Sequence, residues 1–381
     1  GTLNPKGYED EISKKIAPWF STLYLVLLYL SIGPFFAIPR TATTAYEVGI
    51  APMLPTGVGS IGLLIFTSIY FLAAFLIALN PSKILDRIGR ILTPVFVILI
   101  IVLIILGAMK YSNHAPQIAS EAYAQSAFGQ GFLEGYNTLD ALAAVAFSVI
   151  AVTTLNQLGF ANKKEYVRTI WLVGLVVTLA FSILYVGLGY LGNHFPIPTE
   201  VMTSDTHKGV YVLSQATQAI FGSGSQIFLA AMVTVTCFTT TAGLIVSTGE
   251  FFHKRFPQIS YKTYSILFTL IGFSIANLGL STIINYSLPV LMILYPITIT
   301  IVLLVILNKV FALSKTGMRL TILFVTLVSI AMVVVDHIDF PLLANGVKLL
   351  PFASLSLPWL VPALIGMVLS LILPDKQVDR L

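Results

Sequence analysis

Charged residues are scarce in this sequence of 381 residues. Asp, Glu, Lys and Arg together make up 10% of it, hydrophobic residues make up 57%, and the mean hydropathy is +0.92. A soluble globular domain carries about 25% charged residues, so this composition excludes one. Because so much apolar surface cannot be hidden in one core, the sequence predicts an all-α, polytopic membrane protein whose surface faces lipid.

Cysteine and grouped metal ligands are nearly absent as well. Cys237 is the only cysteine, which excludes an intrachain disulfide and a Cys-based metal site. The five histidines fall in expected loops or at span ends, so we expect no transition metal. The sequence also has no Gly-x-x-x-x-Gly-Lys loop for nucleotide phosphates. A transporter with this sequence would therefore draw its energy from an ion gradient.

Ten apolar runs are long enough to cross the hydrocarbon core, which takes about 20 helical residues. They cover residues 17–38, 58–80, 91–109, 133–157, 168–192, 220–250, 262–280, 283–308, 318–336 and 354–374. This pattern predicts a cytoplasmic lead-in at 1–16, a transmembrane domain at 17–374 and a cytoplasmic tail at 375–381. Interfacial or re-entrant helices are expected at 41–56, 112–131 and 196–215.

The basic residues are distributed in alternation along the chain. The formal net charge is +5, and all Lys and Arg except Arg40, Lys110, Lys208 and Lys348 fall in every second loop. Such loops are cytoplasmic in polytopic membrane proteins, so both termini are expected in the cytoplasm. Because the basic residues form no helical stripe, we expect no nucleic acid partner.

The stretch Tyr29–Ile50 reads YLSIGPFFAIPRTATTAYEVGI and combines a helix break with charge. Pro34 lacks a backbone donor, so the Gly33-Pro34 pair predicts a bend or a stop in the first span. Loosened backbone at membrane depth is tolerated where protein or a water-filled cavity covers it. With Arg40 and Glu47 close behind, the pattern indicates the wall of a pathway. A kinked span followed by interfacial charges is the alternative.

The fourth span carries a carboxylate, Asp140, inside the membrane. On a continuous helix, residues at i, i+4, i+7 and i+8 spacing share one face. The face that contains Asp140 comprises Tyr136, Asp140, Ala143, Ala144, Phe147 and Ser148. Ionisable groups at this depth indicate a functional site. Simple helix packing, with Asp140 hydrogen-bonded near the outer interface, remains the alternative.

The sixth span carries a stripe of hydroxyl residues, and the eighth carries two prolines. The stripe comprises Thr236, Thr239, Thr240, Gly243 and Ser247. Hydroxyl oxygens suit a small hard cation, although a buried Thr often bonds its own i−4 carbonyl instead. Pro289 and Pro296 are seven residues apart and predict kinks on nearly one side of their helix. That helix is either a bending gate or a plain kinked span.

Several of these segments resemble one protein family. The segment GPFFAIPRTATTAYEVGIAP is similar to a signature of the branched-chain amino acid:cation symporters, a bacterial family in the amino acid–polyamine–organocation superfamily. The segments EGYNTLDALAAVAF, CFTTTAGL and SLPVLMILYP are similar to other helices of the same family. The resemblance of the first segment implies a helix that is interrupted mid-membrane, with free backbone groups that contact the substrate. The resemblance implies a LeuT-like transporter built from two inverted five-helix repeats.

In that family the first span here would be the third helix, so the resemblance implies a chain that lacks its first two helices. We therefore expect a fragment of a longer carrier. The implied substrate-binding residues are Tyr29, Ser31, Gly33, Ala146, Phe147 and Ser148. The implied sodium-binding residues are Thr236, Thr239 and Thr240. Gating or structural roles would fall to Pro34, Arg40, Glu47, Asp140, Pro289 and Pro296.

The function implied is secondary active symport, not enzymatic catalysis. The protein would import leucine, isoleucine and valine across a bacterial cell membrane by alternating access, coupled to Na⁺ or H⁺ and with no other cofactor. Its partners would be the amino acid and membrane lipid, and the sequence does not predict an oligomeric state. An integral-membrane enzyme, a channel and a non-functional fragment of a transporter are the alternatives. An enzyme would need acid, base or metal ligands clustered at one membrane depth, and only Asp140 is expected well inside a span.

Overall fold

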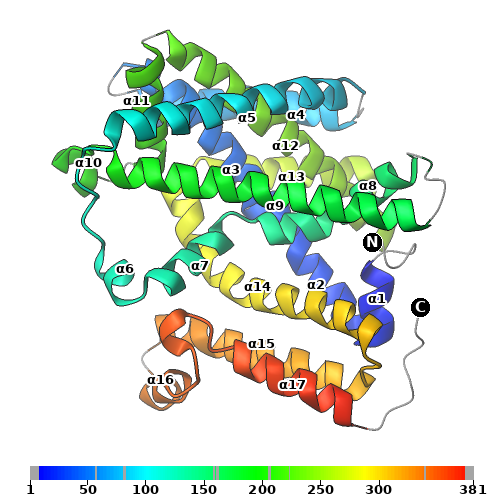
Figure 1. Cartoon of the computed structure of the whole chain (residues 1–381). Coiled ribbons are helices and arrows are strands. Elements are labelled where there is room, and N and C mark those ends of the chain that lie inside the picture. Colours follow the sequence, from blue (N-terminus) through cyan, green and yellow to red (C-terminus); the bar gives the residue numbers. More distant parts are fainter. Residues whose placement is uncertain are drawn as a thin grey trace. The chain divides into compact units, whose positions relative to one another are not determined.

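The computed structural model describes residues 8–55, 58–79, 83–157, 159, 163–204, 207–222, 224–338 and 340–373. Within these ranges helices are the only regular secondary structure, which confirms the predicted all-α class (Figure 1). The described residues form two units. Unit 1 comprises those of Gly1–Ile32, Ala119–Gln157 and Asn285–Leu381, and unit 2 comprises those of Gly33–Ile118 and Leu158–Ile284. The predicted tail at 375–381 lies outside the described residues.

Two elements lie across the division, η1 (Ser31–Phe35) and α14 (Leu280–Val310). The other elements of unit 1 are α1 (Tyr8–Lys15), α2 (Pro18–Leu30), α6 (Glu121–Gln125), α7 (Ala127–Asn137), α8 (Asp140–Gln157), α15 (Lys315–His337), α16 (Pro341–Lys348), η4 (Ala353–Leu355) and α17 (Leu360–Ile372). Those of unit 2 are α3 (Ala37–Thr44), η2 (Ala45–Ile50), η3 (Ala51–Met53), α4 (Gly59–Leu79), α5 (Lys83–Tyr111), α9 (Lys163–His194), α10 (Thr199–Thr203), α11 (Lys208–Phe221), α12 (Ser225–Arg255) and α13 (Tyr261–Ala276).

Unit 2 is organised around α12, which packs against α3, η2, α4, α5, α11 and α13. Leu229 and Ile245 of this helix are fully buried. A glycine permits its closest approach to η2, because a Cβ on Gly49 would lie 3.0 Å from the Cα atom of Ala230. Small residues allow membrane helices to pack backbone against backbone in this way. The hydroxyl stripe of α12 therefore lies on the central helix of its unit.

In unit 1 the tightest pair of helices is α15 and α17. A Cβ on Gly366 would lie 2.6 Å from the Cα atom of Thr321, so only glycine fits at that crossing. The backbone N–H of Ser314 donates to the carbonyl of Ser370 at 2.7 Å. The Ser314 hydroxyl in turn accepts the N–H of Gly317 at 3.0 Å and caps the start of α15. Local capping and close packing together position this pair.

Seven helical stretches of the described residues are long and apolar enough to cross a membrane. They are Pro18–Met53, Gly59–Leu79, Pro94–Tyr111, Lys164–His194, Ser225–Arg255, Leu280–Asn308 and Lys315–His337. The chain is thus a multi-pass membrane protein. Of the other predicted spans, 133–157 is interrupted between α7 and α8, 262–280 contains α13 of 16 residues, and 354–374 contains α17 of 13 residues. The count of ten stays a prediction.

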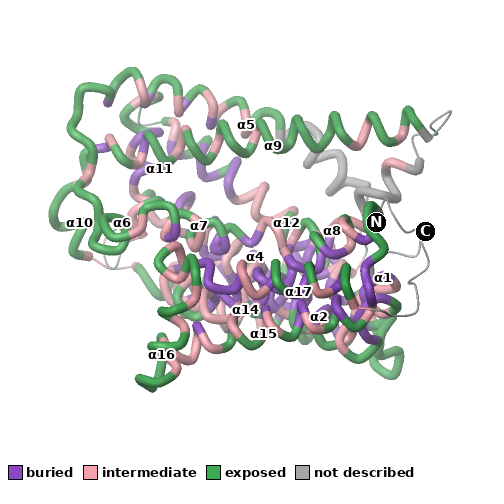
Figure 2. Tube along the Cα trace, turned by 60° about the horizontal axis from the view of Figure 1, so that its bottom comes forward, coloured by how far each residue is buried: buried purple, intermediate pink, exposed green. Residues whose placement is uncertain are grey.

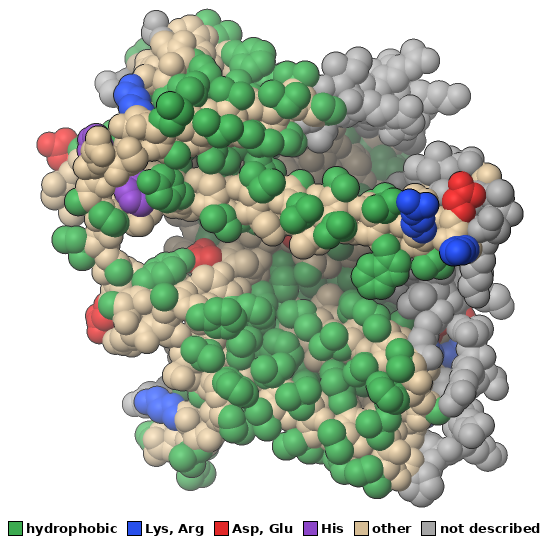
Figure 3. All heavy atoms as spheres, in the orientation of Figure 1, with side chains coloured by type: hydrophobic (Ala, Val, Ile, Leu, Met, Phe, Trp, Pro, Cys, Tyr) green, Lys and Arg blue, Asp and Glu red, His purple; other side chains and the backbone are tan. Residues whose placement is uncertain are grey.

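The exposed surface of these helices is apolar. In Figure 2 the trace of α9 is mostly in the exposed colour, and no residue in its most apolar window is buried. Hydrophobic side chains cover the visible faces of α9 and α15, while charged side chains gather near helix ends (Figure 3). Such surfaces are stable in contact with acyl chains and not with water.

Candidate functional site

The predicted helix break at Gly33-Pro34 is confirmed. Gly33 has non-helical torsion angles (φ −91°, ψ −121°) within η1, between α2 and α3. Tyr29 is buried at the end of α2, and the buried Ser31 hydroxyl donates to the carbonyl of Leu27 at 2.8 Å. The interruption leaves backbone polar groups without the regular i−4 partners of a helix, because Pro34 has no N–H.

A second interruption lies between α7 and α8, whereas the family resemblance implies one farther along this span, beside Ala146, Phe147 and Ser148. Thr138 and Leu139 separate the helices, and Leu139 adopts a left-handed conformation (φ 64°). The Thr138 hydroxyl accepts the N–H of Asp140 at 3.4 Å, so Asp140 lies in the first turn of α8. Its predicted place within a continuous fourth span is therefore wrong. For the same reason Tyr136 does not share one continuous helical face with Phe147.

The residues beside this second interruption are aromatic and buried. Tyr136 is 3% exposed, and its ring stacks on that of Tyr295 with centroids 4.4 Å apart and planes inclined by 23°. Asn137 is also buried. Stacked aromatic rings next to an irregular backbone segment combine an apolar wall with hydrogen-bonding groups. This combination suits a small amphipathic ligand.

The remaining predicted substrate residues lie farther along α8. Ala146 is 4% exposed, whereas Phe147 and Ser148 are half-buried. The Ser148 hydroxyl donates to the carbonyl of Val145 at 2.8 Å, within its own helix. Because α8 packs against α2, the helix that carries Tyr29 adjoins the helix that carries these residues in unit 1.

The predicted ion-binding threonines lie on α12 in unit 2. Thr239 and Thr240 both donate to the carbonyl of Thr236, at 2.9 Å and 3.0 Å, and Thr240 is exposed. Donation to the helix uses the hydroxyl proton and leaves oxygen lone pairs for a cation. The Thr236 hydroxyl is buried with no hydrogen-bond partner. Among the described residues no three His, Cys, Asp or Glu side chains group as metal ligands.

The hydroxyl that joins α12 to its neighbours is that of Thr241, which the sequence did not single out as a ligand. Its oxygen lies 2.5 Å from the Thr41 hydroxyl on α3 and 2.8 Å from the Tyr70 hydroxyl on α4. The Thr41 hydroxyl reaches the Ile38 carbonyl at 2.7 Å. The Thr241 hydroxyl also lies 3.0 Å from the Cys237 carbonyl, so it can donate there or to Thr41, while Tyr70 donates to Thr241 and Thr41 to the Ile38 carbonyl. Three helices are thereby joined inside unit 2.

Glu47 lies in η2, and its carboxylate accepts the backbone N–H of Leu280 at 3.2 Å. This contact ties η2 to the first residue of α14, where a helix presents unpaired N–H groups and favours negative charge. Arg40 lies half-buried on α3. A gating or structural role for Arg40 and Glu47 stays a prediction.

The two prolines of the eighth predicted span do not interrupt their helix, since α14 continues through Pro289 and Pro296. Tyr24 of α2 and Thr298 of α14, both in unit 1, form a buried hydroxyl contact of 2.8 Å. A gating role for the prolines stays a prediction.

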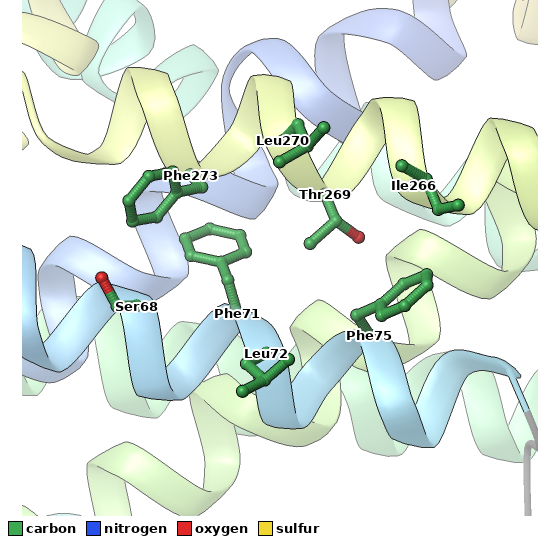
Figure 4. A pocket seen from close by; sticks show the side chains of 8 residues that line it. All are labelled: Ser68, Phe71, Leu72, Phe75, Ile266, Thr269, Leu270 and Phe273. Carbon is green, nitrogen blue, oxygen red and sulfur yellow. The ribbon is translucent and has the colours of Figure 1, made fainter.

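An apolar groove of about 300 Å³ runs between α4 and α13 in unit 2. Phe71, Phe75 and Phe273 line it, with Thr269 between them (Figure 4). The Thr269 hydroxyl is buried with no hydrogen-bond partner. Because both helices also expose large apolar side chains nearby, the groove belongs to the surface that faces lipid.

Comparison with known proteins gives one consistent result. The family model described as "Branched-chain amino acid transport protein" matches residues 2–377. A protein of Staphylococcus aureus (strain USA300), named as a branched-chain amino acid carrier, is 38% identical over 376 residues, which cover 97% of this chain and 83% of that protein. A similarly named protein of Staphylococcus saprophyticus is 38% identical over 378 residues, covering 98% and 84%. No solved structure matches the chain.

Proposed function

Because the chain belongs to the family of branched-chain amino acid transport proteins, we propose that it is a secondary carrier that imports leucine, isoleucine and valine. Import is coupled to Na⁺ or H⁺ and proceeds by alternating access. The protein lies in a bacterial cell membrane with both termini in the cytoplasm. The distribution of Lys and Arg among the loops supports this orientation.

The observation that carries the proposal is the interruption between α7 and α8, in a chain of this family. Free backbone groups at a broken membrane helix are suited to the ammonium and carboxylate of a zwitterion. The buried rings of Tyr136 and Tyr295 adjoin that break and offer apolar surface to an aliphatic side chain. The substrate would bind there, with Tyr29, Ala146, Phe147 and Ser148 on the adjoining helices of unit 1.

The coupling ion would bind at the hydroxyl stripe of α12. Thr239 and Thr240 keep their oxygen lone pairs, and the buried Thr236 hydroxyl has no partner of its own. Hydroxyl and carbonyl oxygens are the ligands that hard cations take. A proton could not use the same oxygens as a stable site, because a hydroxyl is not basic near neutral pH. The stripe therefore favours Na⁺ as the coupling ion.

The test is leucine uptake into proteoliposomes containing the purified protein. An inward sodium gradient should drive leucine accumulation, and an ionophore that dissipates it should abolish accumulation. A proton gradient imposed in potassium buffer is the second arm. Accumulation in that arm alone would assign H⁺ as the coupling ion. Uptake that responds to neither gradient would overturn coupled transport.

A further inference from the structure

A pocket of about 480 Å³ lies in unit 2. It forms where η3 ends, α4 begins, α13 ends and α14 begins. Ends of membrane helices lie near the lipid–water boundary, so the pocket is open to an aqueous side. It is lined by Tyr46, Glu47, Ala51, Leu54, Pro55, Gly59, Ser60, Leu63, Asn277, Leu278 and Gly279.

Glu47 is the only carboxylate among these lining residues, and no Lys, Arg or His side chain joins it. One of its oxygens accepts the N–H of Leu280 at 3.2 Å. A carboxylate offers about four acceptor positions, so that single bond leaves most of its capacity unused. The pocket therefore carries a carboxylate that no cationic side chain among the lining residues pairs with.

Two neutral polar side chains of the pocket, Tyr46 and Asn277, are already engaged, whereas the exposed Ser60 hydroxyl also lines it. The Tyr46 hydroxyl donates to the carbonyl of Gly59 at 3.0 Å. The Asn277 side chain donates to the carbonyl of Phe273 at 2.8 Å and accepts from the Thr67 hydroxyl at 3.2 Å. The only charged side chain on this wall is the Glu47 carboxylate, which favours a cationic ligand.

The rest of the wall selects among cations. Leu54, Leu63 and Leu278 give the pocket an aliphatic side, and its volume falls within the range of about 300–1,000 Å³ that small-molecule sites occupy. A bare alkali ion makes no use of aliphatic surface. A primary ammonium attached to a branched alkyl group uses both features at once.

We propose that this pocket is a second binding site, which takes a primary ammonium on Glu47 and a branched aliphatic group on the leucines. For this chain the ligand class is the amino acid that it carries, held by its ammonium end with its carboxylate toward the aqueous mouth. This identification depends on the proposed function. The pocket would load substrate at the membrane boundary.

The probe for this site is 3-methylbutylamine, which has the ammonium and the branched alkyl group but no carboxylate. Its binding to the purified protein in detergent is measured by saturation-transfer NMR and by calorimetry. In Glu47→Gln the amide oxygen can still accept the Leu280 N–H, so the fold is kept and the charge is lost. Binding should weaken about tenfold or more, as expected for loss of a charged hydrogen bond.

Two further variants make the result specific. Glu200→Gln removes an exposed carboxylate from α10 in the same unit and should bind the amine as the wild type does. Ser60→Lys places a cation on an exposed lining position and should block the amine without altering Glu47. Equal binding by the wild type and Glu47→Gln would overturn the proposal.

Competition identifies the cation. 3-Methylbutanoate, with the same alkyl group on a carboxylate, should not displace the amine. If NaCl displaces the amine but choline chloride at equal ionic strength does not, the Glu47 carboxylate binds an alkali ion, and the proposed ammonium site is overturned.

Leucine uptake separates this proposal from the proposed function. If the wild type accumulates leucine but Glu47→Gln binds the amine normally, only the proposal of a second site is rejected. If the wild type does not take up leucine, the proposed function is rejected.

Discussion

Gly33 and Thr248 approach so closely that no side chain fits between them. A Cβ on Gly33 would lie 2.9 Å from the Oγ1 atom and 3.0 Å from the Cγ2 atom of Thr248. The Thr248 hydroxyl is fully buried and has no hydrogen-bond partner. The break at Gly33 can therefore pack this closely against α12 only because glycine has no Cβ atom.

Gly33→Ala should destabilise the protein by about 1–3 kcal/mol, because overpacking forces side chains or backbone to shift. Thermal unfolding of the purified protein in detergent measures the effect. Thr248→Ala removes both crowding atoms and loses no hydrogen bond, so the double variant Gly33→Ala/Thr248→Ala should recover most of the stability. Additive losses in the double variant would show that the crowding lies elsewhere.

Thr241→Val keeps the side-chain volume and removes the hydroxyl that joins α3, α4 and α12. The Tyr70 hydroxyl would then lose the oxygen that lies 2.8 Å from it. Polar contacts between membrane helices are worth about 0.6–1.7 kcal/mol, and the midpoint of thermal unfolding should fall accordingly. Thr240→Val is the matched control, because Thr240 is exposed and bonds only its own helix. Equal losses in the two variants would contradict the interhelical role of Thr241.

Thr240→Ala should separate ion coupling from folding. The Thr240 hydroxyl donates only to the Thr236 carbonyl, so its removal should leave thermal stability nearly unchanged. If its oxygen binds the coupling ion, the sodium concentration that half-activates leucine uptake should rise about tenfold, as for loss of one favourable ligand. Unchanged sodium activation would remove Thr240 from the ion site.

Gly366→Ala should weaken the packing of α15 and α17. The added carbon would lie 2.6 Å from both the Cα atom and the hydroxyl oxygen of Thr321. The expected loss is about 1–3 kcal/mol, measured by thermal unfolding. Gly174→Ala is the control, since a Cβ on Gly174 in α9 would meet nothing within 4 Å. There the better helix propensity of alanine should leave stability unchanged or raise it. A loss at Gly174 as large as that at Gly366 would refute the packing argument.

The residues themselves indicate the position of the first helix break, whereas the second was implied only by the family resemblance and lies at residues that do not indicate it. The Gly33-Pro34 pair indicates a break without knowledge of its neighbours in space, because proline lacks a backbone hydrogen-bond donor at any position. Thr138-Leu139 contains neither glycine nor proline, and Leu139 takes a left-handed conformation that its residue type disfavours. A local turn signal was present, because the Thr138 hydroxyl accepts the N–H of Asp140 two residues later. The apolar residues on both sides of it nevertheless favoured the prediction of one continuous span.

The hydroxyl stripe on α12 also shows what a sequence pattern can and cannot predict. Helical periodicity correctly placed Thr236, Thr239 and Thr240 near one another, and Thr239 and Thr240 both bond the carbonyl of Thr236. Periodicity could not identify Thr241 as the residue that contacts other helices. Its partners, Thr41 and Tyr70, are 200 and 171 residues away in the sequence. Contacts of this kind depend on tertiary packing, which a single sequence does not reveal.

The length of α9 has a consequence for the membrane around it. Its uncharged part after Arg168, residues 169–192, extends about 36 Å at 1.5 Å per residue, whereas the hydrocarbon core is about 30 Å thick. No residue of its most apolar window is buried, so lipid contacts this part of the helix. The helix therefore tilts or thickens the bilayer locally, and each ångström of mismatch costs a fraction of a kcal/mol. Lipids of longer acyl chain should fit this protein better than short ones.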